Sequence, residues 1–142
     1  MRAKFIDVNG VRTRYLYEGS GDPLVLLHGS GAFADNFYKK IDTLADPGYA
    51  VYAPDLIGHG FTDPIDFEGP PEPHMSNHVA QFVDLMGLSR FFLAGWSMGC
   101  LMACLVYFTM PKRIRKLVLI SGGAVSTNQP KYPWRSGAIS RT

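Results

Sequence analysis

Beyond Ser97 the sequence contains no aspartate, no glutamate and no histidine, although the chain continues to Thr142. All 4 histidines and all 12 acidic residues therefore precede this serine. A serine hydroxyl is a weak nucleophile unless a base takes its proton and a third group orients that base. Residues 98–142 supply neither group, which excludes a catalytic acid or histidine after Ser97 within these residues.

Cysteine is scarce, and no apolar run is long. The 2 cysteines, Cys100 and Cys104, lie one helical turn apart, which favours small core side chains in a reduced compartment over a disulfide or a metal site. The N-terminus lacks the apolar segment of a secretion signal, and the longest apolar stretch, residues 98–108, is too short to span a bilayer. We therefore expect a cytoplasmic protein with no membrane partner.

Neither sign of charge dominates, because the formal net charge is +2. The only dense group of cations is found at Lys112, Arg113, Arg115 and Lys116. It lies between a helix and a strand, where cations complement the carboxyl end of the helix dipole. We therefore expect no nucleic-acid partner. No residues have metal-ligand or dinucleotide-binding spacing, so no cofactor is expected.

Apolar periodicity predicts alternating strands and helices. An Asn9-Gly10 turn joins the first two strands as a hairpin, and residues 24–27 form a continuous apolar run typical of a central parallel strand. A mostly parallel α/β sheet with an antiparallel N-terminal hairpin follows from this order. We expect strands at 3–8, 11–17, 24–27, 49–53, 91–95 and 115–120, helices at 35–45, 76–86 and 98–109, a loop at 63–74, and no periodic structure at 121–142.

The segment Gly95-Trp96-Ser97-Met98-Gly99 lies between an apolar strand and an apolar helix. This pattern is typical of a nucleophile elbow, a sharp strand-to-helix turn that exposes a serine hydroxyl above the sheet. Side chains at Gly95 and Gly99 would crowd this strained turn. The alternative is a serine in a glycine-rich turn that only caps a helix.

The chain resembles the α/β-hydrolase fold from its hairpin to about Gly123. The resemblance rests on four segments, residues 24–31, 55–62, 95–99 and 116–122. They include the turn His28-Gly29 and the segment Asp55-Leu56-Ile57-Gly58-His59-Gly60. The resemblance implies that residues 1–123 are the N-terminal portion of a hydrolase core that lacks its last strands and final helix. Residues 124–142 would be an irregular tail, with Tyr132, Pro133 and Trp134 at the start of a lid.

Within this fold, Ser30-Gly31, Asn36-Phe37 and the Ser97-Met98-Gly99 turn are most similar to carbon–carbon bond hydrolases of aromatic ring-cleavage pathways. Esterases and lactonases share many of these letters, so cleavage of an ester and of a carbon–carbon bond both stay open for a small carbonyl substrate. A serine at position 97 argues against the epoxide hydrolase and haloalkane dehalogenase branches, which have an aspartate there.

A tetrahedral intermediate needs preorganised backbone donors aimed at its oxygen. One donor is the N–H of Met98, which directly follows the nucleophile and opens a helix. The resemblance implies that the other is the N–H of Ser30 or Gly31. For Gly29 and Gly31, the alternative is a turn glycine with no catalytic contact.

The resemblance also implies that an acid and then a histidine follow the serine. His28 is expected to be structural, His59 lies in the Gly-x-Gly loop, and His74 and His78 are expected to be solvated. None is expected to serve Ser97 as a base.

Three hypotheses follow. The first is the N-terminal part of a serine-type hydrolase, inactive alone. The second is a non-catalytic protein that binds a small ligand, and the third is one half of a split hydrolase completed by another chain. Without further strands, residues 116–120 would form an open apolar edge through which the chain self-associates.

Overall fold

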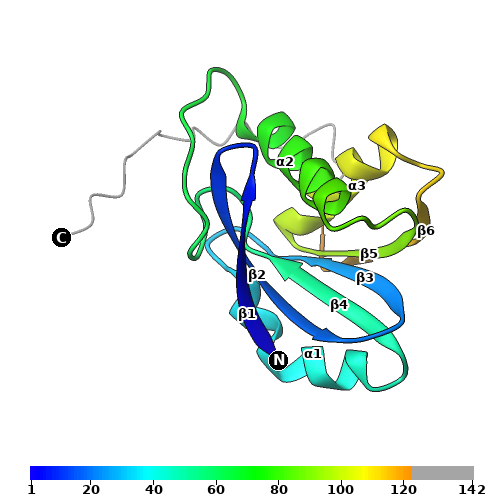
Figure 1. Ribbon diagram of the computed structural model, residues 1–142. Coiled ribbons are helices and arrows are strands. Elements are labelled where there is room, and N and C mark those ends of the chain that lie inside the picture. Colours follow the sequence, from blue (N-terminus) through cyan, green and yellow to red (C-terminus); the bar gives the residue numbers. More distant parts are fainter. Residues whose placement is uncertain (123–142) are drawn as a thin grey trace.

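The computed structural model describes residues 1–122 of the chain. Within that range, six strands form one sheet in the order β1-β2-β4-β3-β5-β6 (Figure 1). The predicted boundary at 123/124 and the lid residues Tyr132, Pro133 and Trp134 lie outside the described residues.

The sheet begins with the predicted hairpin of β1 (Arg2–Val8) and β2 (Val11–Gly19). Asn9 and Gly10 have φ angles of 50° and 86°, as a type I′ turn requires. The carboxylate of Asp7 accepts a hydrogen bond of 2.7 Å from the N–H of Gly10. Local turn chemistry is therefore sufficient to explain this corner of the fold.

Strand β3 (Asp22–Leu27) lies at the centre of the sheet, parallel to β4 (Tyr49–Pro54) on one side and β5 (Phe91–Trp96) on the other. Strand β6 (Ile114–Ile120) runs parallel to β5 on its far side. The antiparallel pairing of β2 with β4 joins the hairpin to this parallel part. The predicted fold class is confirmed.

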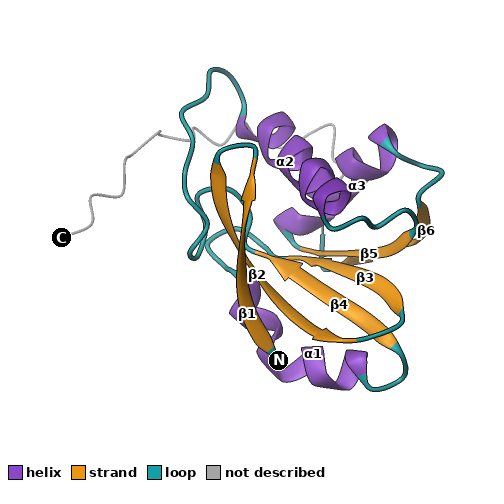
Figure 2. Ribbon diagram, viewed as in Figure 1, coloured by secondary structure: helices purple, strands orange, loops and turns teal. Residues whose placement is uncertain are grey.

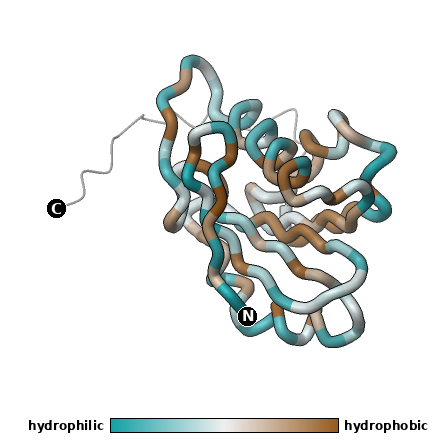
Figure 3. The backbone as a smooth tube through the Cα atoms, in the orientation of Figure 1, coloured by the Kyte–Doolittle hydropathy of each residue, from teal (hydrophilic) through white to brown (hydrophobic). Residues whose placement is uncertain are grey.

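Helices cover both faces of the sheet (Figure 2). Leu24 and Leu26 pack in a core with Ile41 of α1 (Tyr38–Ala45), while Val25 and Leu27 pack in a second core on the other face. That second core includes side chains of α2 (Pro71–Leu85) and α3 (Met98–Thr109). Hydrophobic stretches of backbone gather in the middle of the sheet (Figure 3), as expected for strands buried on both faces.

Two helices begin differently from the prediction. Helix α2 begins at Pro71, inside the predicted loop 63–74 and before the predicted start at residue 76. The first N–H groups of a helix have no intrahelical acceptor, so prolines in the first turn cost no hydrogen bond. The start of α1 was also wrong, because a 3-10 turn (Ala34–Phe37) occupies the first part of the predicted helix 35–45.

Within the described residues, β6 pairs on one side only, with β5. The exposed fractions of Val118, Leu119 and Ile120 are 47%, 45% and 49%. An apolar strand with unpaired backbone groups is a template for association with another chain. The open apolar edge predicted from the sequence is present in the described part of the chain.

We expect the 142-residue chain, produced by itself, to form oligomers through β6, because full burial of one large apolar side chain contributes about 1.5–3 kcal/mol. Leu119→Lys should shift the population toward monomer, since a lysine blunts an edge strand. Leu85→Lys is the matched control, because Leu85 is 51% exposed but lies on α2. Size-exclusion chromatography with light scattering measures both. A wild-type chain that elutes only as a monomer would contradict the expectation.

Candidate active site

Ser97 occupies the tight turn between β5, which ends at Trp96, and α3, which begins at Met98. Its φ and ψ angles are 54° and −119°, a conformation that costs a non-glycine residue about 1–3 kcal/mol. The N–H of Ser97 donates to the carbonyl of Ile120 at 3.0 Å, and its own carbonyl accepts from the N–H of Cys100 at 2.9 Å. Hydrogen bonds on both sides therefore hold the strained residue in place.

Gly95 and Gly99 allow this turn to pack closely. A Cβ at Gly99 would lie 2.2 Å from the carbonyl oxygen of Leu27, and a Cβ at Gly95 would lie 2.2 Å from the carbonyl oxygen of Gly99. Both distances are far below any allowed contact, and the obstructing atoms are backbone. Helix α3 can therefore begin against the end of β3 only with glycine at these two positions.

The loop that follows β3 lies beside the elbow because Leu27 and Gly95 are paired neighbours on parallel strands. A Cβ at Gly29 would lie 3.0 Å from Cβ of Ser97. The N–H of Ala32 donates to the carbonyl of Gly29 at 3.2 Å, and Gly31 has a φ of +67°. The structure thus brings the turn at residues 29–32 next to Ser97.

The backbone donors of this loop fall into two groups. The N–H of Phe33 donates to Oδ1 of Asn36 at 3.1 Å, and that of Ala34 donates to Oδ1 of Asp55 at 2.7 Å. Within residues 1–122, the N–H groups of Ser30 and Gly31 take part in no hydrogen bond. The sequence left these two donors as alternatives, and the hydrogen bonds of the described residues do not separate them.

His28 is fully buried between this loop and the turn after β4. Its Nε2 accepts a hydrogen bond of 2.9 Å from the N–H of Leu56, so the proton is on Nδ1, which donates to the carbonyl of Gly29 at 2.9 Å. Burial lowers the pKa of His28 to about 4. Both ring nitrogens are engaged, so His28 is structural, as expected, and cannot accept a proton from Ser97.

The expectation that His78 is solvated was wrong. His78 is buried on the inner face of α2, and its Nε2–H donates to Oγ1 of Thr13 at 2.8 Å. The Thr13 hydroxyl in turn donates to the carbonyl of Val11 at 2.9 Å. Because burial lowers its pKa to about 4, the ring stays neutral and joins α2 to the hairpin.

The other two histidines also have partners away from the serine. Nδ1 of His59 donates to the carbonyl of Ile57 at 2.9 Å, and Nε2 of His74 donates to that of Glu68 at 3.2 Å. Among residues 1–122, no histidine and no carboxylate forms a hydrogen bond with Ser97. The described part of the chain therefore brings together the predicted nucleophile and donors without a base.

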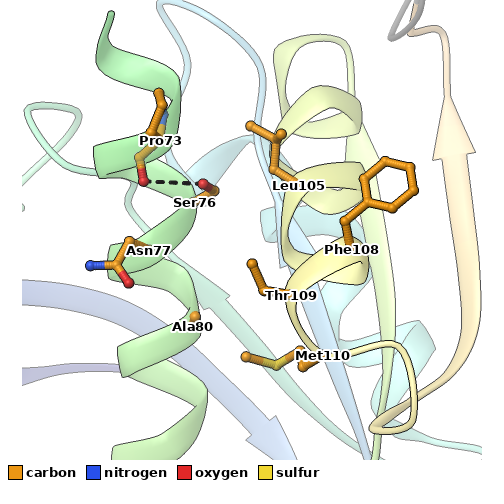
Figure 4. A pocket seen from close by; sticks show the side chains of 8 residues that line it. All are labelled: Pro73, Ser76, Asn77, Ala80, Leu105, Phe108, Thr109 and Met110. Atoms are coloured by element: carbon orange, nitrogen blue, oxygen red, sulfur yellow. Dashed lines mark hydrogen bonds between the residues drawn. The ribbon is translucent and has the colours of Figure 1, made fainter. Parts of the chain in front are cut away.

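A pocket of about 370 Å³ lies between α2 and α3, away from the elbow (Figure 4). Leu105 is the lining residue on α3 nearest to Ser97 along the helix, about 12 Å away at 1.5 Å per residue. None of the lining side chains in residues 1–122 is titratable; they belong to Pro73, Ser76, Asn77, Ala80, Leu105, Phe108, Thr109 and Met110. This pocket is separate from the candidate active site and holds no acid or base for it.

The described residues contain no candidate metal site, no disulfide and no candidate membrane-spanning helix. No group of three or more histidine, cysteine, aspartate or glutamate side chains in residues 1–122 is placed to hold a metal ion. Cys100 and Cys104 are both free thiols. None of the helices in that range has the length and apolar character needed to cross a membrane.

The sequence analysis missed a charged network beside the loop. Arg14 is buried in the middle of β2, and its guanidinium contacts the carboxylates of Asp35 and Asp55. The available signal was an arginine directly before the apolar residues Tyr15 and Leu16 of a predicted strand, because a buried charge requires a partner. Asp55 was recognised within one of the four segments that carry the resemblance, without a role.

A sequence profile of the alpha/beta hydrolase fold matches residues 22–139. The chain belongs to this family. Over 119 residues it is 38% identical to the dihydrolipoyllysine-residue acetyltransferase component of the acetoin cleaving system of Cupriavidus necator, covering 83% of this chain and 31% of that protein. Over 135 residues it is 35% identical to 2-hydroxy-6-oxononadienedioate/2-hydroxy-6-oxononatrienedioate hydrolase of Burkholderia vietnamiensis, covering 89% and 47%.

The chain thus spans less than half the length of each of these relatives. Among solved structures, a membrane phospholipase A described as a bacterial virulence factor matches with a TM-score of 0.83 and 30% identity, over 91% of this chain and 42% of that one. A Vigna radiata epoxide hydrolase matches with a TM-score of 0.78 over 83% of this chain and 37% of that one. At 24% identity, that likeness shows the fold alone and does not bear on the residue at position 97.

These comparisons confirm the predicted family and its similarity to carbon–carbon bond hydrolases.

We expect the free energy of unfolding to fall as the pH is lowered from 6.5 toward 4. The pKa values of His28 and His78 are lowered to about 4 by burial, so in this window the unfolded chain binds protons that the folded chain does not. Each histidine makes the free energy of unfolding fall by about 1.4 kcal/mol for each pH unit in this window. His78→Gln should remove one such slope in denaturant titrations at several pH values.

His74→Gln is the matched control, because the His74 ring stacks on Phe67 outside the core. It makes the same substitution at a ring outside the core, so comparison of the two variants isolates the effect of the buried ring of His78. An unchanged slope in His78→Gln would show that this histidine does not link folding to pH.

Proposed function

We propose that residues 1–142 carry the nucleophile and the oxyanion-binding groups of a serine-type hydrolase that acts on a small carbonyl compound. The supporting observation is the backbone of Ser97, strained at a φ of 54° and fixed between β5 and α3. Strain of this kind persists only where the surrounding structure holds it, and it concentrates at functional sites.

In the proposed reaction, Oγ of Ser97 attacks the carbonyl carbon of the substrate, and the hydroxyl proton passes to a base. The carbonyl oxygen becomes an oxyanion, which accepts hydrogen bonds from the N–H of Met98 and from that of Ser30 or Gly31. The bond to the leaving group then breaks, the leaving group takes the proton, and water releases the acyl group from Ser97. Each oxyanion donor of this kind typically contributes about 100- to 1000-fold in rate.

The base and its orienting acid are proposed to come from polypeptide outside residues 1–142. This follows from the hydrogen bonds of the four histidines, all of which bind elsewhere, and from the absence of acids and histidines after Ser97. The family's order of nucleophile, acid and histidine agrees with this source. Residues 1–142 alone are proposed to be inactive.

Two kinds of bond cleavage remain candidates for the complete enzyme. The Burkholderia vietnamiensis relative is named for a 2-hydroxy-6-oxononadienedioate substrate, which favours cleavage of a carbon–carbon bond beside a ketone. The phospholipase A match at 30% identity favours an ester. Paired assays with a 2-hydroxy-6-oxo-dienoate and a nitrophenyl ester distinguish them.

The isolated 142-residue chain should not react with a fluorophosphonate probe, because no base is present to take the proton of Ser97. Mass spectrometry after incubation measures the labelled fraction, and Ser97→Ala identifies background labelling. Stoichiometric labelling of Ser97 would show that a base within these residues reaches it, and the proposal of an external base would fail.

In a hydrolase completed by the missing acid and histidine, Ser97→Ala should reduce kcat by about 10⁶-fold, the order of loss seen when a serine nucleophile is removed. Ser89→Ala is the control, because Ser89 is exposed on the loop before β5. Circular dichroism checks that both variants fold. Retention of most of kcat in Ser97→Ala would contradict the assignment of the nucleophile.

A further inference from the structure

Arg14 is a buried arginine bound by two carboxylates. Its Nη1 and Nη2 donate to the two oxygens of Asp35 at 2.7 and 3.0 Å, and Nη1 also donates to Oδ2 of Asp55 at 3.4 Å. The guanidinium lies over the ring of Phe61, 4.8 Å from its centroid. The hydrogen bond between the two side chains raises the pKa of Arg14 and lowers that of Asp35, so both stay charged.

Asp55 is fully buried at the end of β4 and connects two loops. Its Oδ1 accepts from the N–H of Ala34 at 2.7 Å, and its Oδ2 accepts from the N–H of Phe61 at 2.9 Å. A Cβ at Gly60 would lie 2.3 Å from Oδ2, so the second loop closes directly over the carboxylate. One side chain thus anchors residues 29–34 and residues 55–61.

The buried carboxylate of Asp55 is paired with Arg14. A carboxylate away from water is stable only when it is paired and hydrogen-bonded, and Arg14 is its nearest cation in the described residues. Asp35, at the far end of the same loop, accepts the bidentate bond from Arg14. The guanidinium therefore holds the loop directly through Asp35 and indirectly through Asp55.

We propose that Arg14 is a positioning residue for the oxyanion-binding loop, acting through Asp35 and Asp55 to hold the N–H groups of Ser30 and Gly31 beside Ser97. This inference rests on the proposed function of that loop. A displacement of about 1 Å at such donors can cost about 100-fold in rate. Because the oxyanion forms only in the transition state, the loss should appear in kcat and not in KM.

Amide hydrogen exchange of the 142-residue chain tests the positioning role of Arg14 without any catalysis. In Arg14→Gln, exchange at Ala34 and Phe61 should accelerate at least about 10-fold, while amides in β3 and α3 keep their wild-type rates. Arg14→Lys, which keeps the charge but not the bidentate geometry, should give an intermediate effect. Arg12→Gln is the matched control, because Arg12 is exposed on the same strand, over Phe5, and should change nothing.

Asp35→Asn provides a second variant in case Arg14→Gln does not fold, because Asp35 is only partly buried. It should accelerate exchange at Ala34 in the same selective way. Unchanged exchange at Ala34 and Phe61, or acceleration spread over the whole fold in both variants, would overturn the positioning role.

In the completed hydrolase, Arg14→Gln should lower kcat by about 10- to 100-fold with KM unchanged, and Arg14→Lys should recover part of the loss. If Ser97→Ala abolishes turnover but Arg14→Gln leaves kcat unchanged, the inference fails and the proposed function stands. If Ser97→Ala retains activity, the proposed function fails, whatever the amide exchange shows.

Discussion

The first turn of α3 packs directly against the carboxyl end of β3. Glycine at position 99 lets the helix start against the carbonyl oxygens of Leu27 and His28, where any side chain would collide with backbone. This contact fixes where α3 begins, and with it the strained turn at Ser97. The N–H of Met98, which opens the helix, and the loop after β3 thereby both lie next to Ser97. The candidate chemistry follows from this packing more than from any property of the serine itself.

Polar groups buried at the strand ends hold the surrounding loops. His28 connects the carbonyl of Gly29 to the N–H of Leu56, and Asp55 connects Ala34 to Phe61. Such groups add little net stability and are costly when they lose a partner. They do give the loops a single arrangement, which is what donors for a developing negative charge require. The same sheet leaves an apolar strand, β6, paired on one side within the described residues.

The strands, the hairpin and helix α3 could be predicted because each has a strong local signal. Residues 98–109 were predicted as a helix and are one, since an uninterrupted apolar segment follows the glycine turn and Pro111 follows its end. The predicted start of α2 was wrong because its prolines were treated as helix breakers, whereas the first turn of a helix tolerates proline. The prediction that His78 is solvated was wrong because its partner, Thr13, lies on a strand far away in the sequence. The sequence showed an arginine in a strand but not its partners, since Asp35 and Asp55 lie far from Arg14 along the chain. The predicted tail at 124–142 stays a prediction, because the structure describes residues 1–122.

The central claim is that Met98 and the turn at Ser30 and Gly31 bind an oxyanion formed on Ser97. A crystal structure of the completed hydrolase with a phosphonate attached covalently to Ser97 tests it most directly. We predict one phosphonate oxygen within hydrogen-bond distance, about 2.7–3.1 Å, of the Met98 nitrogen and of the nitrogen of Ser30 or Gly31. A phosphonate attached to another residue, or an oxygen directed away from both donors, would contradict the account.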